Sequence, residues 1–221
     1  MKRLRGLLRQ DWYIWLMIVA ALLLGIIFFP RLPVKMPIHW DGAGHVNGYG
    51  SRAFGAFVMP CIAAAVYLLL CVIPLIDPRS RNYHKFRSSY QMIKSLTIMI
   101  FLVTQICMIL AGLKVRINVS VITGVAVSVL FILLGNVMGR FRHNYFVGIR
   151  TPWTLASEEV WRKTHRLAGP VWVLGGLINL ALTLFAGRFM VAGTLFVVTI
   201  MALLPCVYSY LVFRRIGGEK H

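Results

Sequence analysis

Six long apolar runs, separated by shorter polar segments, dominate this chain. Each run is about 20 residues long, the length that an α-helix needs to cross the hydrocarbon of a bilayer. The pattern predicts six transmembrane helices, at Trp12–Phe29, Phe54–Ile76, Ser95–Leu113, Val119–Met138, Ala168–Ala186 and Met190–Phe213.

The composition supports this interpretation. Hydrophobic residues make up 59% of the 221 residues and charged residues only 14%, whereas a soluble domain is nearer half apolar and a quarter charged. We therefore expect an all-α membrane protein embedded in the lipid bilayer.

The net charge of +18 is spread between the apolar runs and forms no continuous basic domain, so we expect no direct nucleic-acid binding. The polar segments on one side, with the two ends of the chain, carry 18 Lys and Arg residues, and those on the other side carry 6. Because cytoplasmic segments retain positive charge, both termini are predicted to be cytoplasmic.

Three connecting loops are long: 30–53 outside, and 77–94 and 139–167 inside. Loops of this length are usually functional or disordered. We predict an N-terminal two-helix unit, 1–94, with the outer loop 30–53, and a C-terminal four-helix unit, 95–221, with the inner loop 139–167.

No charged residue falls in the middle of a predicted span, which argues against a proton-driven carrier. Amide side chains do occur in or near the spans, at Gln105, Asn136 and Asn179. Interhelical hydrogen bonds are the favoured role for these amides, and a transport cavity for a small molecule or lipid is the alternative. Nucleophile, metalloprotease and paired-carboxylate motifs are missing, so the sequence predicts neither an enzyme nor a cofactor.

The outer loop has the composition of a folded surface segment. Pro37 favours extended backbone, and several glycines permit tight turns. His39, Trp40, Asp41 and His45 are polar or aromatic residues on this exposed side. His39, Asp41 and His45 are metal-ligand types without a recognised spacing, so hydrogen-bonded structural roles are favoured over a metal site.

The inner loop contains a polar island with two tryptophans. Gly148 and Thr151-Pro152 interrupt any helix that continues from the fourth span. Thr154 or Ser157 can cap a new helix, on which Trp161 and His165 share one face. The segment predicts a short amphipathic helix at the membrane interface. Its tryptophans and arginines suit either interface anchoring with lipid phosphate contact or a specific partner site.

Here the sequence resembles a known family. Gly135-Asn136, Asn144-Tyr-Phe-Val-Gly148-Ile-Arg150-Thr151-Pro152-Trp153-Thr154 and Val160-Trp161-Arg-Lys-Thr164-His165-Arg166 are similar to the signature of the SdpI immunity-protein family. The outer segment from Leu32-Pro33 to Pro60 resembles the N-terminal domain of unknown function that accompanies this signature. Arg52 departs from the pattern, since Lys is expected there.

The resemblance implies a multi-helical protein of the bacterial cytoplasmic membrane that protects its cell against a secreted, membrane-active peptide toxin. It also implies a signalling role in which the protein holds a cytoplasmic repressor at the membrane. The outer-loop residues Pro37, His39, Trp40, Asp41 and His45 are then the toxin-facing candidates. The expected cytoplasmic partner site comprises Asn144, Gly148, Arg150, Thr151, Pro152, Trp153, Thr154, Trp161, Thr164, His165 and Arg166.

Overall fold

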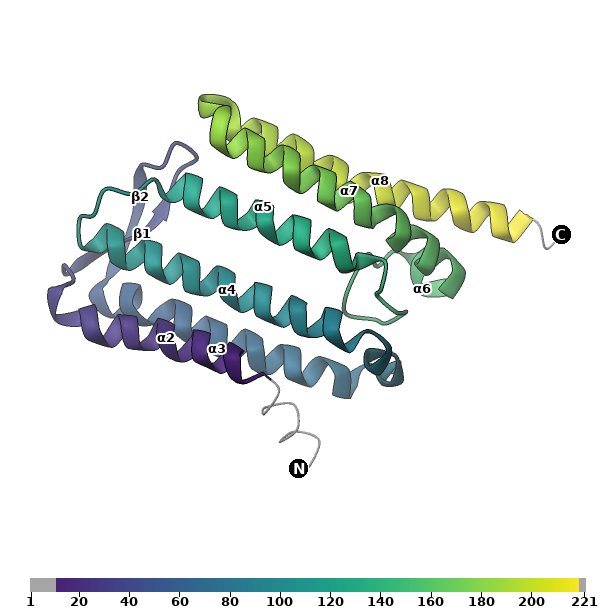
Figure 1. The fold of residues 1–221 in the computed structure, drawn as a ribbon, viewed down its shortest axis with the longest axis horizontal. Helices are drawn as coiled ribbons and strands as arrows, with labels where there is room; N and C mark the ends of the chain where they lie inside the picture. The colour runs from purple at the N-terminus through teal and green to yellow at the C-terminus, as the bar shows by residue number, and fades with distance from the viewer. Residues whose placement is uncertain (1–10, 219–221) are drawn as a thin grey trace. The chain divides into compact units, whose positions relative to one another are not determined.

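Six long helices form most of the computed structural model, which describes residues 11–218 (Figure 1). All six are long and apolar enough to cross a membrane, as the sequence predicts. They are α2 (Trp12–Phe28), α3 (Arg52–Ile76), α4 (Arg87–Gly112), α5 (Val119–Met138), α7 (Glu158–Phe185) and α8 (Met190–Gly218). Many large apolar side chains on these helices are exposed, among them Phe185 at 84% and Phe196 at 67%, as suits lipid-facing surfaces. Four of the basic residues counted on the predicted cytoplasmic side lie outside the described residues: Lys2, Arg3, Arg5 and Arg9.

The remaining elements are short and lie between the long helices. They are β1 (Lys35–Trp40), β2 (Val46–Ser51), the 3-10 turns η1 (Phe29–Arg31), η2 (Ser80–Phe86) and η3 (Gly187–Phe189), and helix α6 (Pro152–Ala156). β1 and β2 pair as an antiparallel hairpin. The all-α expectation is therefore correct for the spans, while the outer loop adds a two-stranded sheet.

The chain packs into two compact units. Unit 1 contains residues up to Cys71 together with Lys94–Ala126, and unit 2 contains Val72–Ile93 together with residues from Val127 onward. The helices α3, α4 and α5 contribute to both. The core of unit 1 has one cluster around Ile14, Ala63, Tyr67 and Ile98, and a second around Leu32, Met36, Ala56 and Ile109.

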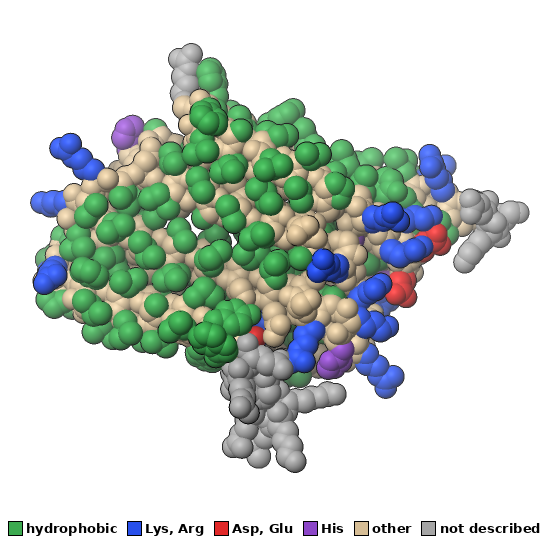
Figure 2. All heavy atoms as spheres, in the orientation of Figure 1, with side chains coloured by type: hydrophobic (Ala, Val, Ile, Leu, Met, Phe, Trp, Pro, Cys, Tyr) green, Lys and Arg blue, Asp and Glu red, His purple; other side chains and the backbone are tan. Residues whose placement is uncertain are grey.

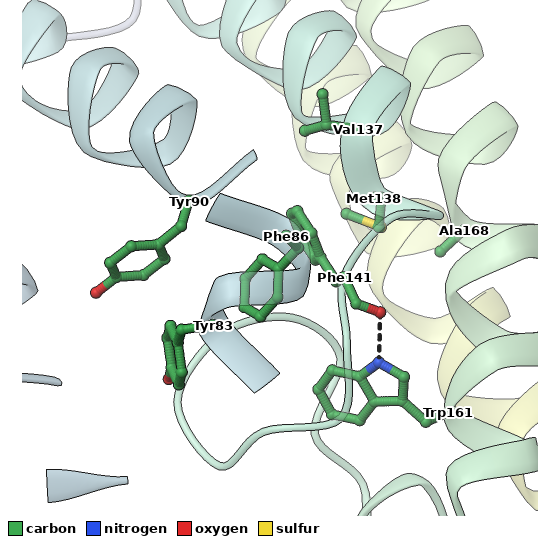
Figure 3. Close-up of a cluster of buried hydrophobic side chains, with 8 residues drawn as sticks. All are labelled: Tyr83, Phe86, Tyr90, Val137, Met138, Phe141, Trp161 and Ala168. Carbon is green, nitrogen blue, oxygen red and sulfur yellow. Dashed lines mark hydrogen bonds between the residues drawn. The ribbon is translucent and has the colours of Figure 1, made fainter. Parts of the chain in front are cut away.

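Unit 2 combines an aromatic cluster with closely packed helices. Tyr83, Phe86, Tyr90, Phe141 and Trp161 form the cluster (Figure 3). Helices α7 and α8 lie side by side (Figure 1). A Cβ atom at Gly135 on α5 would lie 2.7 Å from the carbonyl oxygen of Gly169 on α7, so the absence of a side chain lets these two backbones touch.

Two helices begin eight or more residues before their predicted spans. Helix α4 begins at Arg87, eight residues before the predicted span. The predicted interfacial helix in the inner loop is replaced by the five-residue α6 and by the start of α7, which runs unbroken from Glu158 to Phe185. Ser157 does cap α7, since its side chain accepts the backbone N–H of Val160.

Candidate functional site

The outer hairpin, residues 35–51, has a tightly bonded turn. One carboxylate oxygen of Asp41 accepts the backbone N–H groups of Ala43 and His45, each at 2.9 Å. Gly44 occupies φ +87°, a conformation that favours glycine. The N–H of His45 is the main cause that lowers the pKa of Asp41. Asp41 therefore shapes this turn.

A buried methionine anchors the hairpin in unit 1. Met36 on β1 is 0% exposed, and it fits against two glycines on neighbouring helices. An added Cβ would lie 2.7 Å from Met36 at Gly55 on α3 and 2.6 Å from it at Gly112 on α4. The hydroxyl of Ser120 on α5 also donates to the carbonyl of Asp41 at 3.1 Å. Contacts with three helices thus hold the hairpin in place.

The predicted toxin-facing residues differ in their exposure. His39 and His45 are exposed, whereas Trp40 and Asp41 are half-buried. Pro37 is buried within β1, which removes it from any docking surface. Tyr49 on β2, which the sequence analysis did not select, is 62% exposed.

The predicted metal-ligand types lie in two separate pairs. His39 is hydrogen-bonded to Asn47, and His45 contacts Asp41 at 3.4 Å. In the described part of the chain, no three His, Cys, Asp or Glu residues converge as a metal site would require.

In unit 2, one buried carboxylate joins two inner loops. Asp77, which follows α3, is 3% exposed. It accepts the N–H of Arg79 at 2.7 Å, the hydroxyl of Tyr83 at 2.9 Å and the N–H of Tyr145 at 3.0 Å. Because Tyr145 belongs to the motif loop, residues 139–157, Asp77 ties that loop to the segment after α3.

A buried asparagine shapes the motif loop from within. The side-chain oxygen of Asn144 accepts the N–H groups of Phe146 at 2.9 Å and Val147 at 2.6 Å. Its amide donates to the carbonyls of Arg142 at 2.8 Å and Val147 at 2.9 Å. Asn144 is 0% exposed. Its side-chain amide therefore supplies the backbone groups of this bend with the hydrogen bonds that a helix or strand would otherwise provide.

His165 on α7 supports the next part of the loop. The N–H of Ile149 donates to Nε2 of His165 at 2.9 Å, and Nδ1 lies 2.9 Å from the carbonyl oxygen of Trp161. Nε2 must therefore lack a proton and Nδ1 must carry one, which defines a neutral tautomer. Gly148 has φ +107°, and a Cβ there would lie 2.4 Å from Nε2, so this loop position requires glycine.

Trp161 completes the support beneath the loop. Its indole N–H donates to the carbonyl of Phe141 at 3.0 Å (Figure 3). Its ring stacks on His165 with centroids 4.1 Å apart, and His143 lies 5.1 Å away. Burial lowers the pKa of His143, and the nearby positive charge of Arg79 lowers it further.

The end of the motif loop is fastened to α8. Thr151 and Thr154 form a reciprocal capping box at α6, and the hydroxyl of Thr151 lies 2.9 Å from that of Ser209 on α8. The rings of Trp153 and Tyr210 are 5.0 Å apart. Both contacts arise within unit 2.

These contacts divide the predicted partner site into two sets. Its buried members cannot present a surface to a partner, and they hold the loop instead: Asn144, Thr151, Thr154, Trp161, Thr164 and His165. Gly148 meets His165, and Trp153 is half-buried. Arg150, Pro152 and Arg166 remain exposed.

The intramembrane amides form interhelical hydrogen bonds, the role favoured from sequence. Gln105 donates to the carbonyl of Ala56 on α3 at 2.9 Å, and Asn179 donates to the hydroxyl of Ser128 on α5 at 2.8 Å. Asn136 differs, since it is exposed near the end of α5.

The sequence analysis missed a buried ion pair in unit 1. Lys94 on α4 donates to the carboxylate of Asp11, which also accepts the hydroxyl of Tyr67 at 3.2 Å. The Lys94 and Asp11 side chains are 3% and 0% exposed. The sequence predicts a loop position for Lys94, because the third apolar run begins at Ser95. The single acidic residue of an otherwise basic N-terminal segment was the available signal.

Comparison with known proteins places these two sites in context. Residues 140–209 match the SdpI/YfhL protein family, and residues 16–64 match a domain of unknown function, DUF1648. Residues 140–209 thus form a region similar to the SdpI/YfhL family. The family resemblance predicted from sequence is thus confirmed. The SdpI-family region lies wholly in unit 2 and contains most of the motif loop, whereas the DUF1648 match lies in unit 1 and contains the outer hairpin.

Two curated relatives come from Bacillus subtilis (strain 168). The chain is 26% identical to "Immunity protein SdpI" over 205 residues, which cover 93% of this chain and 96% of the relative. It is 35% identical to "Uncharacterized membrane protein YbgB" over 49 residues, which cover 22% of this chain and 54% of that protein. No solved structure gives a significant match. With its six apolar helices, this SdpI-like chain is a multi-pass membrane protein.

Proposed function

We propose that this chain is a non-enzymatic immunity protein that protects its cell against a secreted, membrane-active peptide toxin. The observation that carries the proposal is the similarity to an immunity protein over nearly the full length of both chains. The similarity includes the outer hairpin and the motif loop. The similarity therefore supports a function of the whole membrane protein and not of one segment alone.

The outer hairpin is the proposed toxin-facing surface. It belongs to the predicted extracytoplasmic side, where a secreted peptide arrives. Met36 and the Ser120–Asp41 hydrogen bond hold the hairpin against its helices, so little ordering is required when a partner binds. The exposed side chains of His39, His45 and Tyr49 supply polar and aromatic contacts.

A signalling role through a cytoplasmic repressor is the second part of the proposal. The motif loop lies on the predicted cytoplasmic side, and its buried hydrogen bonds hold Pro152 in an exposed position. Arg166 is exposed on the adjoining turn of α7. A repressor that docks here would contact these surface residues and would leave Asn144, Trp161 and His165 untouched.

Transport without proton coupling has less support. The amides of Gln105 and Asn179, which were the candidate cavity groups, donate to neighbouring helices. A transport cavity at these positions would have to break those bonds.

A toxin challenge tests the proposal. Cells sensitive to a membrane-active peptide should survive when they express this chain and die when they carry the empty vector, at equal toxin dose. Unchanged killing despite normal amounts of the protein in the membrane, across the peptides tested, would contradict immunity.

Membrane fractionation tests the signalling part separately. With a tagged repressor encoded beside this gene, Arg166→Glu should move the repressor from the membrane fraction to the soluble fraction, because the charge is reversed. Lys163→Glu, on the same exposed part of α7, serves as the matched control. If the repressor stays soluble in cells that express the unmodified chain, docking is contradicted. The immunity proposal is not affected by that result, because the toxin challenge tests it separately.

A further inference from the structure

Two guanidinium groups in unit 2 contact the same exposed tyrosine, one at its ring and one at its backbone carbonyl. The guanidinium of Arg79 lies over the ring of Tyr145, 5.0 Å from its centroid. Arg150 donates from Nη1 to the carbonyl of Tyr145 at 3.0 Å. Both arginines therefore contact the same residue of the motif loop.

Among the described side chains, neither Arg79 nor Arg150 forms an ion pair with a carboxylate. Asp77, the nearest acid in sequence to Arg79, accepts backbone and tyrosine donors instead. Moreover, Nη1 of Arg79 has no hydrogen-bond partner among the described residues. Buried polar atoms are usually paired, so this guanidinium has donor capacity left for an acceptor that is not part of the chain.

The apolar surface beside Arg79 indicates the class of that ligand. At the end of α3, Val72, Leu75 and Ile76 are exposed by 44%, 52% and 57%. Arg79 follows only three residues later. An acyl chain against the end of α3 would place its headgroup at the Arg79 guanidinium. Lys and Arg side chains also gather at the end of the molecule where α6 and the end of α8 lie (Figure 2). Their positive charge favours an anionic headgroup over a neutral one.

We propose that Arg79 and Arg150, around Tyr145, bind the phosphate of an anionic phospholipid whose acyl chains lie against the end of α3. A planar guanidinium can donate two parallel hydrogen bonds to a phosphate. The arrangement fixes a lipid where the segment after α3 meets the motif loop. Bound lipid would therefore stabilise the junction held by Asp77.

Lipid titration of the detergent-purified full chain tests this site. The probes are phosphatidylglycerol, phosphatidylcholine with the same acyl chains, and inorganic phosphate, and native mass spectrometry measures bound lipid. Phosphatidylglycerol should bind best, and Arg79→Gln should weaken it about tenfold, as the loss of a charge-assisted pair predicts. Arg166→Gln, an exposed cation elsewhere on α7, should change binding less than about twofold.

Arg150→Gln provides a second variant, because its exposed side chain is replaced without touching the core. Arg150→Gln should weaken phosphatidylglycerol binding more than Arg166→Gln does. If Arg79→Gln does not fold, this comparison alone tests the proposed lipid site. Equal losses in the Arg79 and Arg166 variants would overturn the site, since binding would then follow total charge. Equal binding of phosphatidylcholine, or equal stabilisation by inorganic phosphate, would overturn the assignment to an anionic lipid.

Discussion

Replacing Asp77 with alanine should loosen the motif loop more than any comparable change at the surface. Asp77 is 3% exposed and accepts three hydrogen bonds, from Arg79, Tyr83 and Tyr145. Alanine leaves all three donors without their acceptor. The neutral amide of Asp77→Asn keeps one oxygen acceptor and should have a smaller effect.

The magnitude follows from the surroundings of each donor. The hydroxyl of Tyr83 is buried and retains only a 3.4 Å contact with Asn144, so its loss costs about 1–3 kcal/mol. The backbone N–H groups of Arg79 and Tyr145 lie nearer solvent, and each contributes about 0.5–1.5 kcal/mol. The expected loss in the free energy of unfolding is about 4 kcal/mol, which lowers Tm by roughly 8–16 °C for a chain of this length.

Thermal unfolding in detergent, followed by tryptophan fluorescence, measures this loss. Glu159→Ala is the control, because its ion pair with Lys163 at 2.8 Å is about half exposed on both sides and contributes under about 1 kcal/mol. If Asp77→Ala and Glu159→Ala shifted Tm equally, Asp77 would not hold the loop, and the reasoning would fail.

Two further predictions concern the same loop. Gly148→Ala should lower Tm by several degrees, because φ is +107° and the new Cβ would lie 2.4 Å from Nε2 of His165. Gly139→Ala is the control and should leave Tm unchanged, because a Cβ there has nothing within 4 Å. Equal shifts in Tm for the two variants would contradict the close contact at Gly148. The pKa of His143 is lowered in the fold from its ordinary value of 6.5, so the unfolded chain binds more protons as pH falls through 6.5 and stability is lost. Between pH 7.5 and pH 5, the Tm of His143→Phe should therefore fall less than the Tm of the unmodified chain. An equal fall in Tm for both proteins would refute this.

The six spans were predictable because membrane crossing depends on a local property, the length of an apolar run. That signal ends where the hydrocarbon ends, so it could not show that α4 continues to Arg87 or that α7 begins at Glu158. The hairpin was missed because β2 contains Asn47, Gly48 and Gly50, which are depleted in strands. Its strand conformation comes from pairing with β1.

The motif residues were selected from sequence, but their roles were not visible there. A partner surface and a buried support have the same residue types, and only contacts across the chain distinguish them. Trp161 reaches Phe141, and Thr151 reaches Ser209, 58 residues away. Likewise, Asp11 and Lys94 are 83 residues apart, so no local pattern announces their pairing.

The central claim, that the outer hairpin protects the cell by engaging a peptide toxin, is tested most directly by survival of toxin-challenged cells that express hairpin variants. Tyr49→Ala, at a side chain 62% exposed on β2, should reduce survival about tenfold or more, as the loss of an exposed aromatic contact can. Val115→Ala, at a side chain 46% exposed outside the hairpin, should protect like the unmodified chain. Full protection by both variants, each present normally in the membrane, would contradict the account.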